Sequence, residues 1–454
     1  MLQTFKNAWK IPDLRKKMIF TLIIVLLYRI GAQLYVPFVD VNAVQSNVAY
    51  SQMTTGIFGM MSLFSGGAFE QATFFALSVS PYITASIVVQ LLTIAIPAWE
   101  NLSKNGGEEG KKKLTKYTRI ITVALSLVTA YGYVKLLDSY SLLKISSSNR
   151  NFAYYFGMIV MIACFCAGAS IIMWLAERIN DHGIGNGISI ILFANIISRG
   201  GTMLTELINL IRDSESYTLF GGTGWKSGWP LVGGIVGIIV YVAVFIALVG
   251  VIVWFTNSER RIPIQYAKRV VGRKMYGGQS SNLPLKMNMA GVMPIIFSSS
   301  IVSIIPTIAN FWPNSWFTKT VVNGWLGSGT PIYIIAYNAL IFAFSYFYIM
   351  ISFNPVEVAN NIRSNGGAIP GIRPGKPTSD YIKKILNRIT TLGAVFLVLV
   401  AGVPMIVGAA LPAFSRLATF GGSSLLIVVG VALETAQAIE AQMSMRNYKG
   451  FLDS

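Results

Sequence analysis

The sequence Phe64-Ser65-Gly66-Gly67-Ala68, followed by Leu77-Ser78-Val79-Ser80-Pro81-Tyr82-Ile83, decides the fold of this chain. It lies within residues 58–96, and no charged residue occurs between Glu70 and Glu100. Such a run is long enough for a membrane span, which needs ~20 apolar residues. Two adjacent glycines disfavour a helix interior, so we expect the chain to break at Gly66 and Gly67.

The piece before the glycines, roughly residues 57–64, is too short to cross a bilayer. A short segment joined by Gly-Gly to a full span is typical of a re-entrant segment. Non-helical backbone at membrane depth persists only where protein or a water-filled cavity surrounds it. The sequence therefore predicts that the protein encloses a cavity, although residues 57–68 are equally consistent with an ordinary external loop.

The composition indicates a membrane protein with many spans. Hydrophobic residues make up 54% of the 454 residues and charged residues only 12%, whereas a soluble domain has about 25% charged residues. The basic N-terminus leads into a full-length apolar span without a small-residue cleavage site, so we expect the first helix to remain as an anchor. The two cysteines, Cys164 and Cys166, form neither a disulfide framework nor a CxxC motif.

Hydropathy predicts ten membrane spans. They are, approximately, residues 18–36, 73–96, 120–134, 154–175, 188–211 (interrupted), 231–255, 289–312, 333–353, 392–411 and 417–433. Both termini and the loops after spans 2, 4, 6 and 8 together hold 27 of the 36 Lys and Arg residues. The positive-inside rule then predicts a multi-pass protein of the cell membrane with both termini in the cytoplasm.

Ten spans divide into two halves of five, residues 1–215 and 216–454. An odd number of spans gives the two halves opposite orientations, and such inverted repeats place a pathway at their interface. Several spans are short or interrupted by charge or glycine, and segments of this kind usually line an interior. The predicted fold class is an all-α polytopic membrane protein with ten transmembrane helices in two inverted five-helix halves and a re-entrant segment.

Two predicted cytoplasmic loops, residues 256–288 and 354–388, are long and basic. The second contains Pro370-Gly371-Ile372-Arg373-Pro374-Gly375. Basic loops follow from the positive-inside rule alone and contact anionic lipids. Their length and their Pro and Gly content are instead typical of functional loops, and an exposed basic protrusion suits RNA phosphates or an acidic protein face.

The sequence contains no recognisable catalytic or metal-binding constellation. The one histidine, His182, cannot build a metal site or a conventional triad. Gly183-Ile184-Gly185-Asn186-Gly187 lacks the Lys-Ser/Thr of a phosphate loop. We therefore expect no enzyme activity, no cofactor and no metal. Arg29 lies inside the first span, where an ionisable residue is functional by default, but we prefer a structural pairing with a backbone or interfacial partner.

Motifs along almost the whole chain resemble the SecY family, the channel subunits of the bacterial Sec protein translocase. Besides the opening stretch they include Gly183 to Ile190, Tyr266-Ala267-Lys268-Arg269, Leu283-Pro284-Leu285-Lys286, Asn288-Met289-Ala290-Gly291-Val292-Met293-Pro294, Phe353-Asn354-Pro355, Pro370 to Gly375, and Gly421-Gly422-Ser423-Ser424-Leu425-Leu426-Ile427. Because these motifs follow one another in the family's order on ten spans, the resemblance is very specific.

The resemblance implies a protein-conducting channel that also opens sideways into lipid, through a lateral gate between spans 2–3 and 7–8. The constriction ring that it implies is Val79, Ile83, Ile188, Leu192, Ile296 and Ile427. It also implies a plug at about residues 57–70, whose plug and hinge residues are Ile57, Phe58, Met60, Met61, Leu63, Phe64, Gly66 and Gly67.

The resemblance also implies several partners for an otherwise passive channel. It implies small SecE-like and SecG-like membrane subunits, and secretory preproteins and their signal peptides as cargo. The SecA motor or the ribosome would bind the basic loops through Arg260, Arg261, Lys268, Arg269, Arg273, Lys274 and Arg373. Two alternatives are a secondary transporter of a small solute, which would need an acidic or histidine site at the midplane, and a membrane-embedded enzyme, which would need a nucleophile or metal set.

Overall fold

Most of the described chain is helical, and proline opens several of the long helices. In the computed structural model, Pro stands in the first helical positions of the helices that begin at Pro12, Ser80, Pro331 and Pro355. Proline suits this place because its missing N–H would have no partner within the helix. The structure describes residues 2–48, 50, 59–104, 106–144, 152–201, 205, 230–266, 269–271, 274–276, 280–309, 311–312, 315–327, 330–410 and 422–449.

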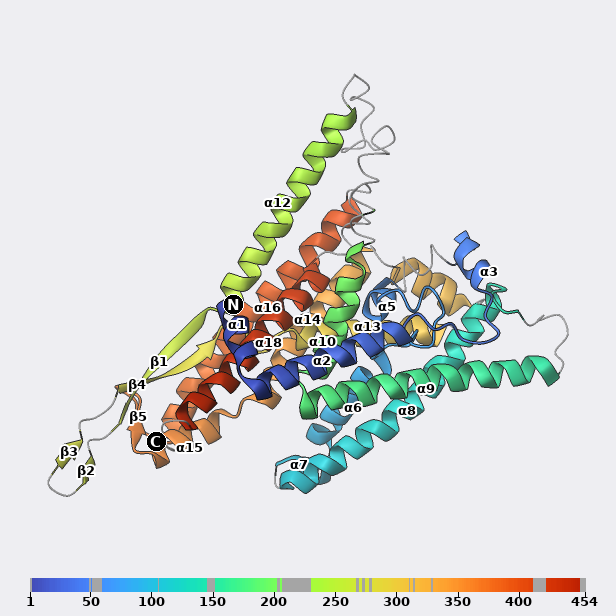
Figure 1. The fold of residues 1–454 in the computed structure, drawn as a ribbon. Coiled ribbons are helices and arrows are strands. Elements are labelled where there is room, and N and C mark those ends of the chain that lie inside the picture. Colours follow the sequence, from blue (N-terminus) through green and yellow to red (C-terminus); the bar gives the residue numbers. More distant parts are fainter. Residues whose placement is uncertain are drawn as a thin grey trace.

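The described elements fall into two successive sets (Figure 1). The first is α1 (Leu2–Lys10), α2 (Pro12–Gly31), α3 (Val41–Ser46), α5 (Gly59–Ser65), α6 (Ser80–Ala95), α7 (Pro97–Lys104), α8 (Gly107–Ser139), α9 (Phe152–His182) and α10 (Gly187–Ser198). The second is α12 (Pro230–Thr256), α13 (Met293–Ala309), the π-helix η1 (Phe317–Trp325), α14 (Pro331–Ser352), α15 (Pro355–Ser364), α16 (Lys376–Ala410) and α18 (Gly422–Lys449). The strands are β1 (Glu259–Tyr266), β2 (Arg269–Val271), β3 (Lys274–Tyr276), β4 (Ser280–Lys286) and β5 (Gly367–Ala368).

Each predicted span overlaps a helix of the described chain. The helices concerned are α2, α6, α8, α9, α10, α12, α13, α14, α16 and α18. By length and composition alone, five helices of the described chain are suited to cross a membrane, and the pair α6 and α7, bent by 108°, would make a sixth. The helices α10 and α13 are apolar but shorter, so they need neighbouring helices around them.

The second span begins later than the sequence predicts. Residues 66–79 form turns, and α6 starts only at Ser80, whereas we expected the span to begin at residue 73. Ala72 and Ser78 adopt positive φ angles of 49° and 50°, which a continuous helix does not allow. Gly66 and Gly67 therefore end α5 as expected, but they do not join it directly to α6.

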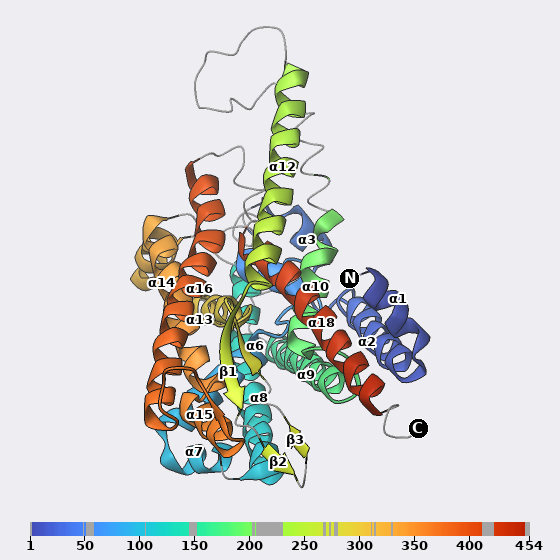
Figure 2. The same cartoon turned by 90° about the vertical axis from the view of Figure 1, so that its left-hand side faces the viewer.

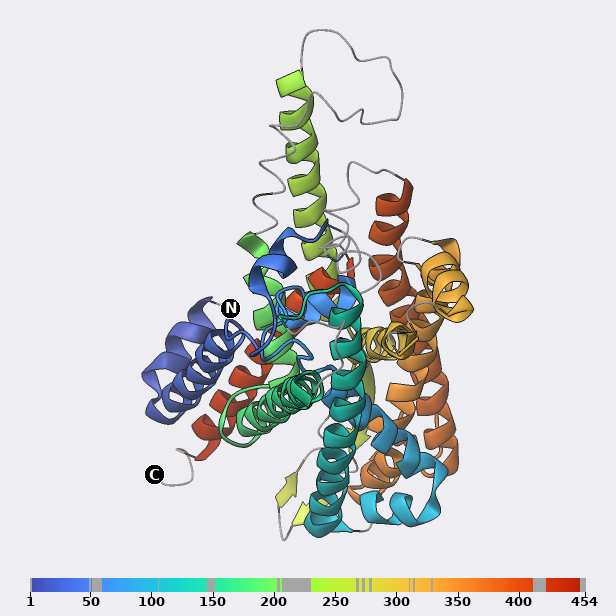
Figure 3. The same cartoon turned by 90° about the vertical axis from the view of Figure 1, so that its right-hand side faces the viewer.

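Helices of the two predicted halves contact one another at the centre of the molecule. In Figures 2 and 3, α14 and α16 lie on one side and α1 and α2 on the other, with α13, α10 and α18 between them. The two halves meet where α6 and α8 contact α13, and where α10 contacts α18. The largest hydrophobic cluster lies at this meeting point, because its buried residues come from both halves.

Candidate pore and plug

The meeting point of the two halves contains a small cavity. Its volume is about 160 Å³, which holds a few water molecules, since a water occupies ~30 Å³ of the liquid. Four helices face it, with three lining residues on α6 at the spacing of one helix face. The lining residues are Ile83, Ser86, Gln90, Asn186, Ile188, Met293, Ile296, Phe297 and Tyr348.

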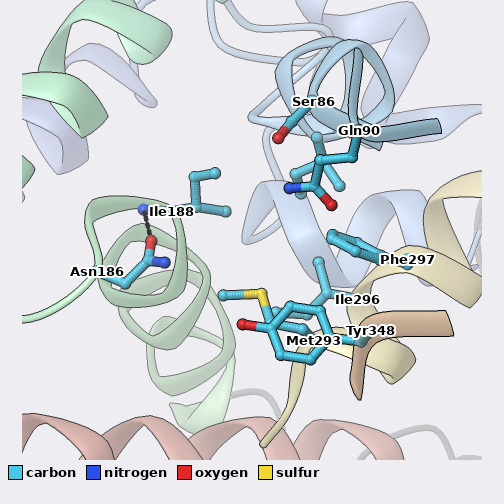
Figure 4. A pocket seen from close by; sticks show the side chains of 9 residues that line it. Ser86, Gln90, Asn186, Ile188, Met293, Ile296, Phe297 and Tyr348 are labelled. Atoms are coloured by element: carbon cyan, nitrogen blue, oxygen red, sulfur yellow. Dashed lines mark hydrogen bonds between the residues drawn. The ribbon is translucent and has the colours of Figure 1, made fainter. Parts of the chain in front are cut away.

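Aliphatic and polar side chains both line the cavity. Ile188 of α10 points across it toward α6 and α13, and Ile296 and Met293 point in from α13 (Figure 4). Gln90 and Asn186 supply the polar groups; the Asn186 side chain caps α10 by accepting a hydrogen bond from the Ile188 N–H at 3.1 Å. The buried Gln90 Oε1 has no hydrogen-bond partner among the described residues, so the cavity offers it room for water.

The structure brings the six ring residues expected from the sequence into one hydrophobic cluster. Val79, Ile83, Leu192, Ile296 and Ile427 are each at most 1% exposed, and Ile188 packs against them while half-buried. Three of the six line the cavity. Val79 is the N-cap residue of α6, four residues before Ile83, and Leu192 lies four residues after Ile188 on one face of α10. The six side chains therefore come together from α6, α10, α13 and α18.

The short helix α5 packs against this aliphatic cluster. Leu63 and Phe64 are 2% and 4% exposed and belong to the same cluster as the six ring residues. Met61 is also buried, and its sulfur lies 3.9 Å from the Thr307 hydroxyl of α13. Of the other plug residues expected, Ile57 and Phe58 lie outside the described residues, and Met60 is described only as part of α5.

The end of α5 is fixed by hydrogen bonds to its last carbonyl groups. The Phe64 carbonyl accepts from the Asn195 Nδ2 amide at 2.5 Å and from the Ser78 hydroxyl at 2.8 Å. The same amide donates to the Tyr28 hydroxyl at 2.9 Å. Two parts of the chain, α10 through Asn195 and the turns through Ser78, therefore donate to this carbonyl, and the buried Tyr28 of α2 holds the Asn195 amide in place.

Gly66 sits where a side chain has no room. Its φ is +64°, and a Cβ built on it would lie 2.8 Å from Arg29 Nη1 and 3.0 Å from Asn195 Oδ1. Gly67 has φ +89° but no atom within 4 Å of such a Cβ. Arg29 Nη1 is buried and has no hydrogen-bond partner in the described part of the chain. The pairing that we expected for Arg29 is therefore absent at that atom.

The turns that follow Gly67 are held by two tyrosines. The hydroxyl groups of Tyr50 and Tyr133 both donate to the Phe69 carbonyl, at 3.0 and 2.6 Å, and lie 3.1 Å from each other. Burial raises the pKa of Tyr50 well above its usual value of 10, and the charge of Glu70 raises this pKa further. The Tyr50 hydroxyl therefore keeps its proton, and remains a donor, throughout the physiological pH range.

Comparison with known proteins identifies the family. Residues 73–436 match the SecY family model. The chain is 42% identical over 461 residues to the protein translocase subunit SecY of Streptomyces galbus, with both chains covered completely. It also resembles a solved protein-conducting channel, with a TM-score of 0.63 and 17% identity over 94% of this chain and 92% of that one. Sec61 in a canine ribosome–channel complex gives a TM-score of 0.60 and 16% identity over the same shares of the two chains.

The chain belongs to the SecY family. It is a protein-conducting channel, a multi-pass membrane subunit of the SecY translocase, and not an enzyme. Membership of the SecY family rules out the alternatives of a solute transporter and a membrane-embedded enzyme. Structural relatives of this SecY channel occur in complexes with ribosomes.

The two basic loops of this SecY channel form one structural unit, which we call the basic loop unit (residues 256–288 and 354–388). Antiparallel pairing joins β1 to β4 along seven residue pairs and joins β5 to the end of β1. Ile262, Ile264 and Leu285 pack with residues of α15 and α16 in a small core of their own. The hairpin projects away from the helices, with β2 and β3 near its far end (Figure 1). Strands and helices therefore make up much of the described part of these two segments.

The basic residues expected to bind partners are distributed over this unit. Arg260 and Arg261 are exposed on β1, and Arg373 is exposed in the turn between β5 and α16. Arg269 and Lys274 lie on β2 and β3. Lys268 and Arg273 fall outside the described residues. Arg261 also approaches Glu259 at 3.8 Å, a weak contact between exposed groups.

The roles of several polar residues at the pore were not predicted from the sequence. The polar residues that line the cavity or hold α5 come from four helices and the turns between them: Ser86, Gln90, Asn186, Asn195, Tyr28, Ser78 and Ser62. A polar residue inside an apolar helix, such as Asn195, is the one signal that sequence reasoning had available. Among the described residues, no group of three or more His, Cys, Asp or Glu side chains could hold a metal ion.

Proposed function

We propose that this channel passes unfolded secretory polypeptides across the cytoplasmic membrane through the aliphatic ring of Val79, Ile83, Ile188, Leu192, Ile296 and Ile427. The observation that carries the proposal is their convergence, from four helices of both halves, into one buried cluster beside a small cavity. An aliphatic constriction excludes water and so blocks ions. Because aliphatic side chains make no directional bonds, the ring can close around a polypeptide of any sequence.

The plug closes the ring in the resting channel. Leu63 and Phe64 bury their side chains in the same cluster as the ring, so they add apolar contact where water would otherwise enter. The plug comprises residues 57–70, of which the structure describes 59–70. To admit a polypeptide, α5 must give up these contacts and the hydrogen bonds at the Phe64 carbonyl.

A lateral gate opens between α6–α8 and α13–α14. The contacts of α13 with α6 and α8 join the two halves on this side, and Ile83, Ile296 and Phe297 line the cavity just inside them. A signal peptide of ~20 apolar residues can compete for this seam, because leaving it for lipid costs such a helix little. Transmembrane segments of the cargo leave the channel along the same route.

The basic loop unit receives the SecA motor or the ribosome on the cytoplasmic side, where the positive-inside rule also puts both termini. Its residues Arg260, Arg261, Lys268, Arg269, Arg273, Lys274 and Arg373 bind rRNA phosphates or acidic protein groups, which favour exposed guanidinium groups. Anionic lipids contact the same basic segments. Small SecE-like and SecG-like subunits complete the translocase.

Planar bilayers test the ring in the purified translocase. We expect Ile83→Gly with Ile188→Gly to raise the resting ion conductance by about tenfold or more, because two of the side chains that exclude water are removed. A matched control is Ile159→Gly with Ile171→Gly, two exposed residues of α9 (65% and 42%). Unchanged conductance in the ring variant, or an equal rise in the control, would contradict the proposal.

A further inference from the structure

A partly exposed ion pair ties the plug region to the far end of α10. Arg199 Nη2 lies 2.6 Å from Glu70 Oε1, and their side chains are 15% and 27% exposed. Arg199 is the residue that caps the C-terminal end of α10. At 1.5 Å per residue, it lies roughly 16 Å along the helix from Ile188 at the cavity. The pair therefore lies at the end of α10 that is away from the cavity.

Ser62 of α5 joins this ion pair. Its hydroxyl donates to Glu70 Oε1 at 2.5 Å and accepts from Arg199 Nη1 at 3.0 Å. Ser62 is fully buried, so water does not reach its hydroxyl group, which bonds to both charged side chains. Three elements are thus connected by one set of bonds: α5 through Ser62, the following turns through Glu70, and α10 through Arg199.

The bonds among Ser62, Glu70 and Arg199 suit a contact that keeps the plug in place and can still break when the plug moves. The apolar contacts of Leu63 and Phe64 resist withdrawal of the plug but do not fix its position, because they are not directional. The bonds to Arg199 are directional, and they anchor α5 to the helix that carries Ile188 and Leu192. A fully buried pair would be very costly to separate, and a fully exposed one would contribute almost nothing. This pair lies between the two limits.

We infer that Ser62, Glu70 and Arg199 are positioning residues that together form an outer latch on the plug. The inference rests on the proposed function of the plug. It adds that these three residues determine how readily the plug opens. When the plug moves away from α10, Ser62 and the carboxylate separate from the guanidinium, and water solvates the two charges. The strength of the latch then determines how often the resting channel opens without cargo.

Charge variants of the purified translocase test the latch in planar bilayers. We expect Glu70→Gln and Glu70→Arg to raise the frequency of ion-conducting openings by about tenfold, between the effects of exposed and buried pairs. Ser62→Ala keeps the ion pair and should have a smaller effect. The exchange variant, Glu70→Arg with Arg199→Glu, should return openings to within about threefold of the wild type, because it restores an ion pair of opposite polarity.

The matched control breaks a similar ion pair elsewhere. Arg119 and Glu177 lie 2.8 Å apart between α8 and α9, and Glu177→Gln removes that pair without touching the plug. The latch is wrong if Glu70→Gln and Glu70→Arg leave the openings unchanged, if Glu177→Gln raises them equally, or if the exchange variant leaks as much as Glu70→Arg. Melting temperatures in detergent within a few degrees of the wild type would establish that the variants are folded.

The same recordings separate failure of the latch from failure of the ring. The variant Ile83→Gly with Ile188→Gly serves as the positive control for leakage. If it leaks while the latch variants do not, only the latch is wrong. If neither the ring variant nor the latch variants leak, the proposed ring is wrong and so is the latch.

Discussion

Gly66 is the residue at which the fold of the plug is most constrained. Its φ of +64° disfavours any residue with a side chain, and a Cβ there would meet Arg29 Nη1 at 2.8 Å. Ordinary contacts with a Cβ are longer than 3.4 Å. The neighbouring Gly67 has the same kind of backbone angle but open space around it. A side chain at either position would therefore strain the backbone, but only a side chain at Gly66 would also clash with its neighbours.

We predict that Gly66→Ala displaces the plug and that Gly67→Ala does so much less. Both variants incur the cost of a left-handed residue, ~1–2 kcal/mol, but only Gly66→Ala also forces Arg29 or Asn195 to move. The measurement is the rate at which a membrane-impermeant maleimide labels Leu63→Cys in a variant with Cys164→Ser and Cys166→Ser. Labelling should rise severalfold for Gly66→Ala alone. Equal rates for the two glycine variants would contradict this steric explanation.

The break at these glycines could be predicted from the sequence, but the close contact at Gly66 could not. Two adjacent glycines suffice to end a short helix, and this expectation is confirmed by their positive φ angles. The contact between Gly66 and Arg29 depends on α2 lying beside the plug, and spacing along the chain carries no information about that neighbour. Most aliphatic residues of a span face lipid or the protein core, so the sequence does not show which of them form a ring. The six ring residues were chosen from the family resemblance.

At the scale of elements, the turns between α5 and α6 are the least expected part of the fold. Their apolar residues match a membrane helix by hydropathy, so the sequence predicted a span from residue 73. Hydrogen bonds to other elements stabilise the turns instead: Phe69 O accepts from two tyrosines, and the Phe74 N–H donates to Leu34 O at 2.7 Å. Pro81 was the signal available in the sequence for the true start of α6, because proline favours the first helical turn.

We predict that the two tyrosines act as partly redundant donors to Phe69 O. Tyr50→Phe or Tyr133→Phe alone leaves one hydroxyl on this carbonyl, so each should reduce the free energy of unfolding by only ~0.5–1.5 kcal/mol. The double variant leaves the buried carbonyl without either donor and should cost ~1–3 kcal/mol more than the sum of the two. Unfolding of the purified protein by denaturant in detergent measures all three changes. Strict additivity would contradict the shared-acceptor arrangement.

The basic loop unit was predicted only in part. The sequence indicated two long, basic, Pro- and Gly-rich loops, and the structure joins them through the pairing of β5 with β1. Strand β1 alternates buried Ile262 and Ile264 with exposed residues, a period-two pattern that predicts a strand. A Cβ built on Gly367 of β5 would lie 3.1 Å from the Ile264 side chain, and sequence alone does not reveal such close packing.

At the scale of the whole molecule, hydropathy and charge predicted the helices well and their arrangement poorly. All ten spans overlap helices, because an apolar segment in a membrane has few other ways to satisfy its backbone hydrogen bonds. Which helices meet depends on side-chain packing between distant parts of the chain. The seam between α6 and α13 followed from the family resemblance rather than from any pattern within one span, and the contact between α10 and α18 was not predicted.

A polypeptide in transit should pass between Ile83 and Ile188. Photo-crosslinking tests it most directly, with a crosslinking amino acid at position 83, at position 188 or, as a control, at position 159 on the exposed face of α9, and a secretory chain stalled in transit. We expect the stalled chain to form adducts at positions 83 and 188 and not at 159. Adducts that are absent from positions 83 and 188, or equally strong at 159, would contradict the account.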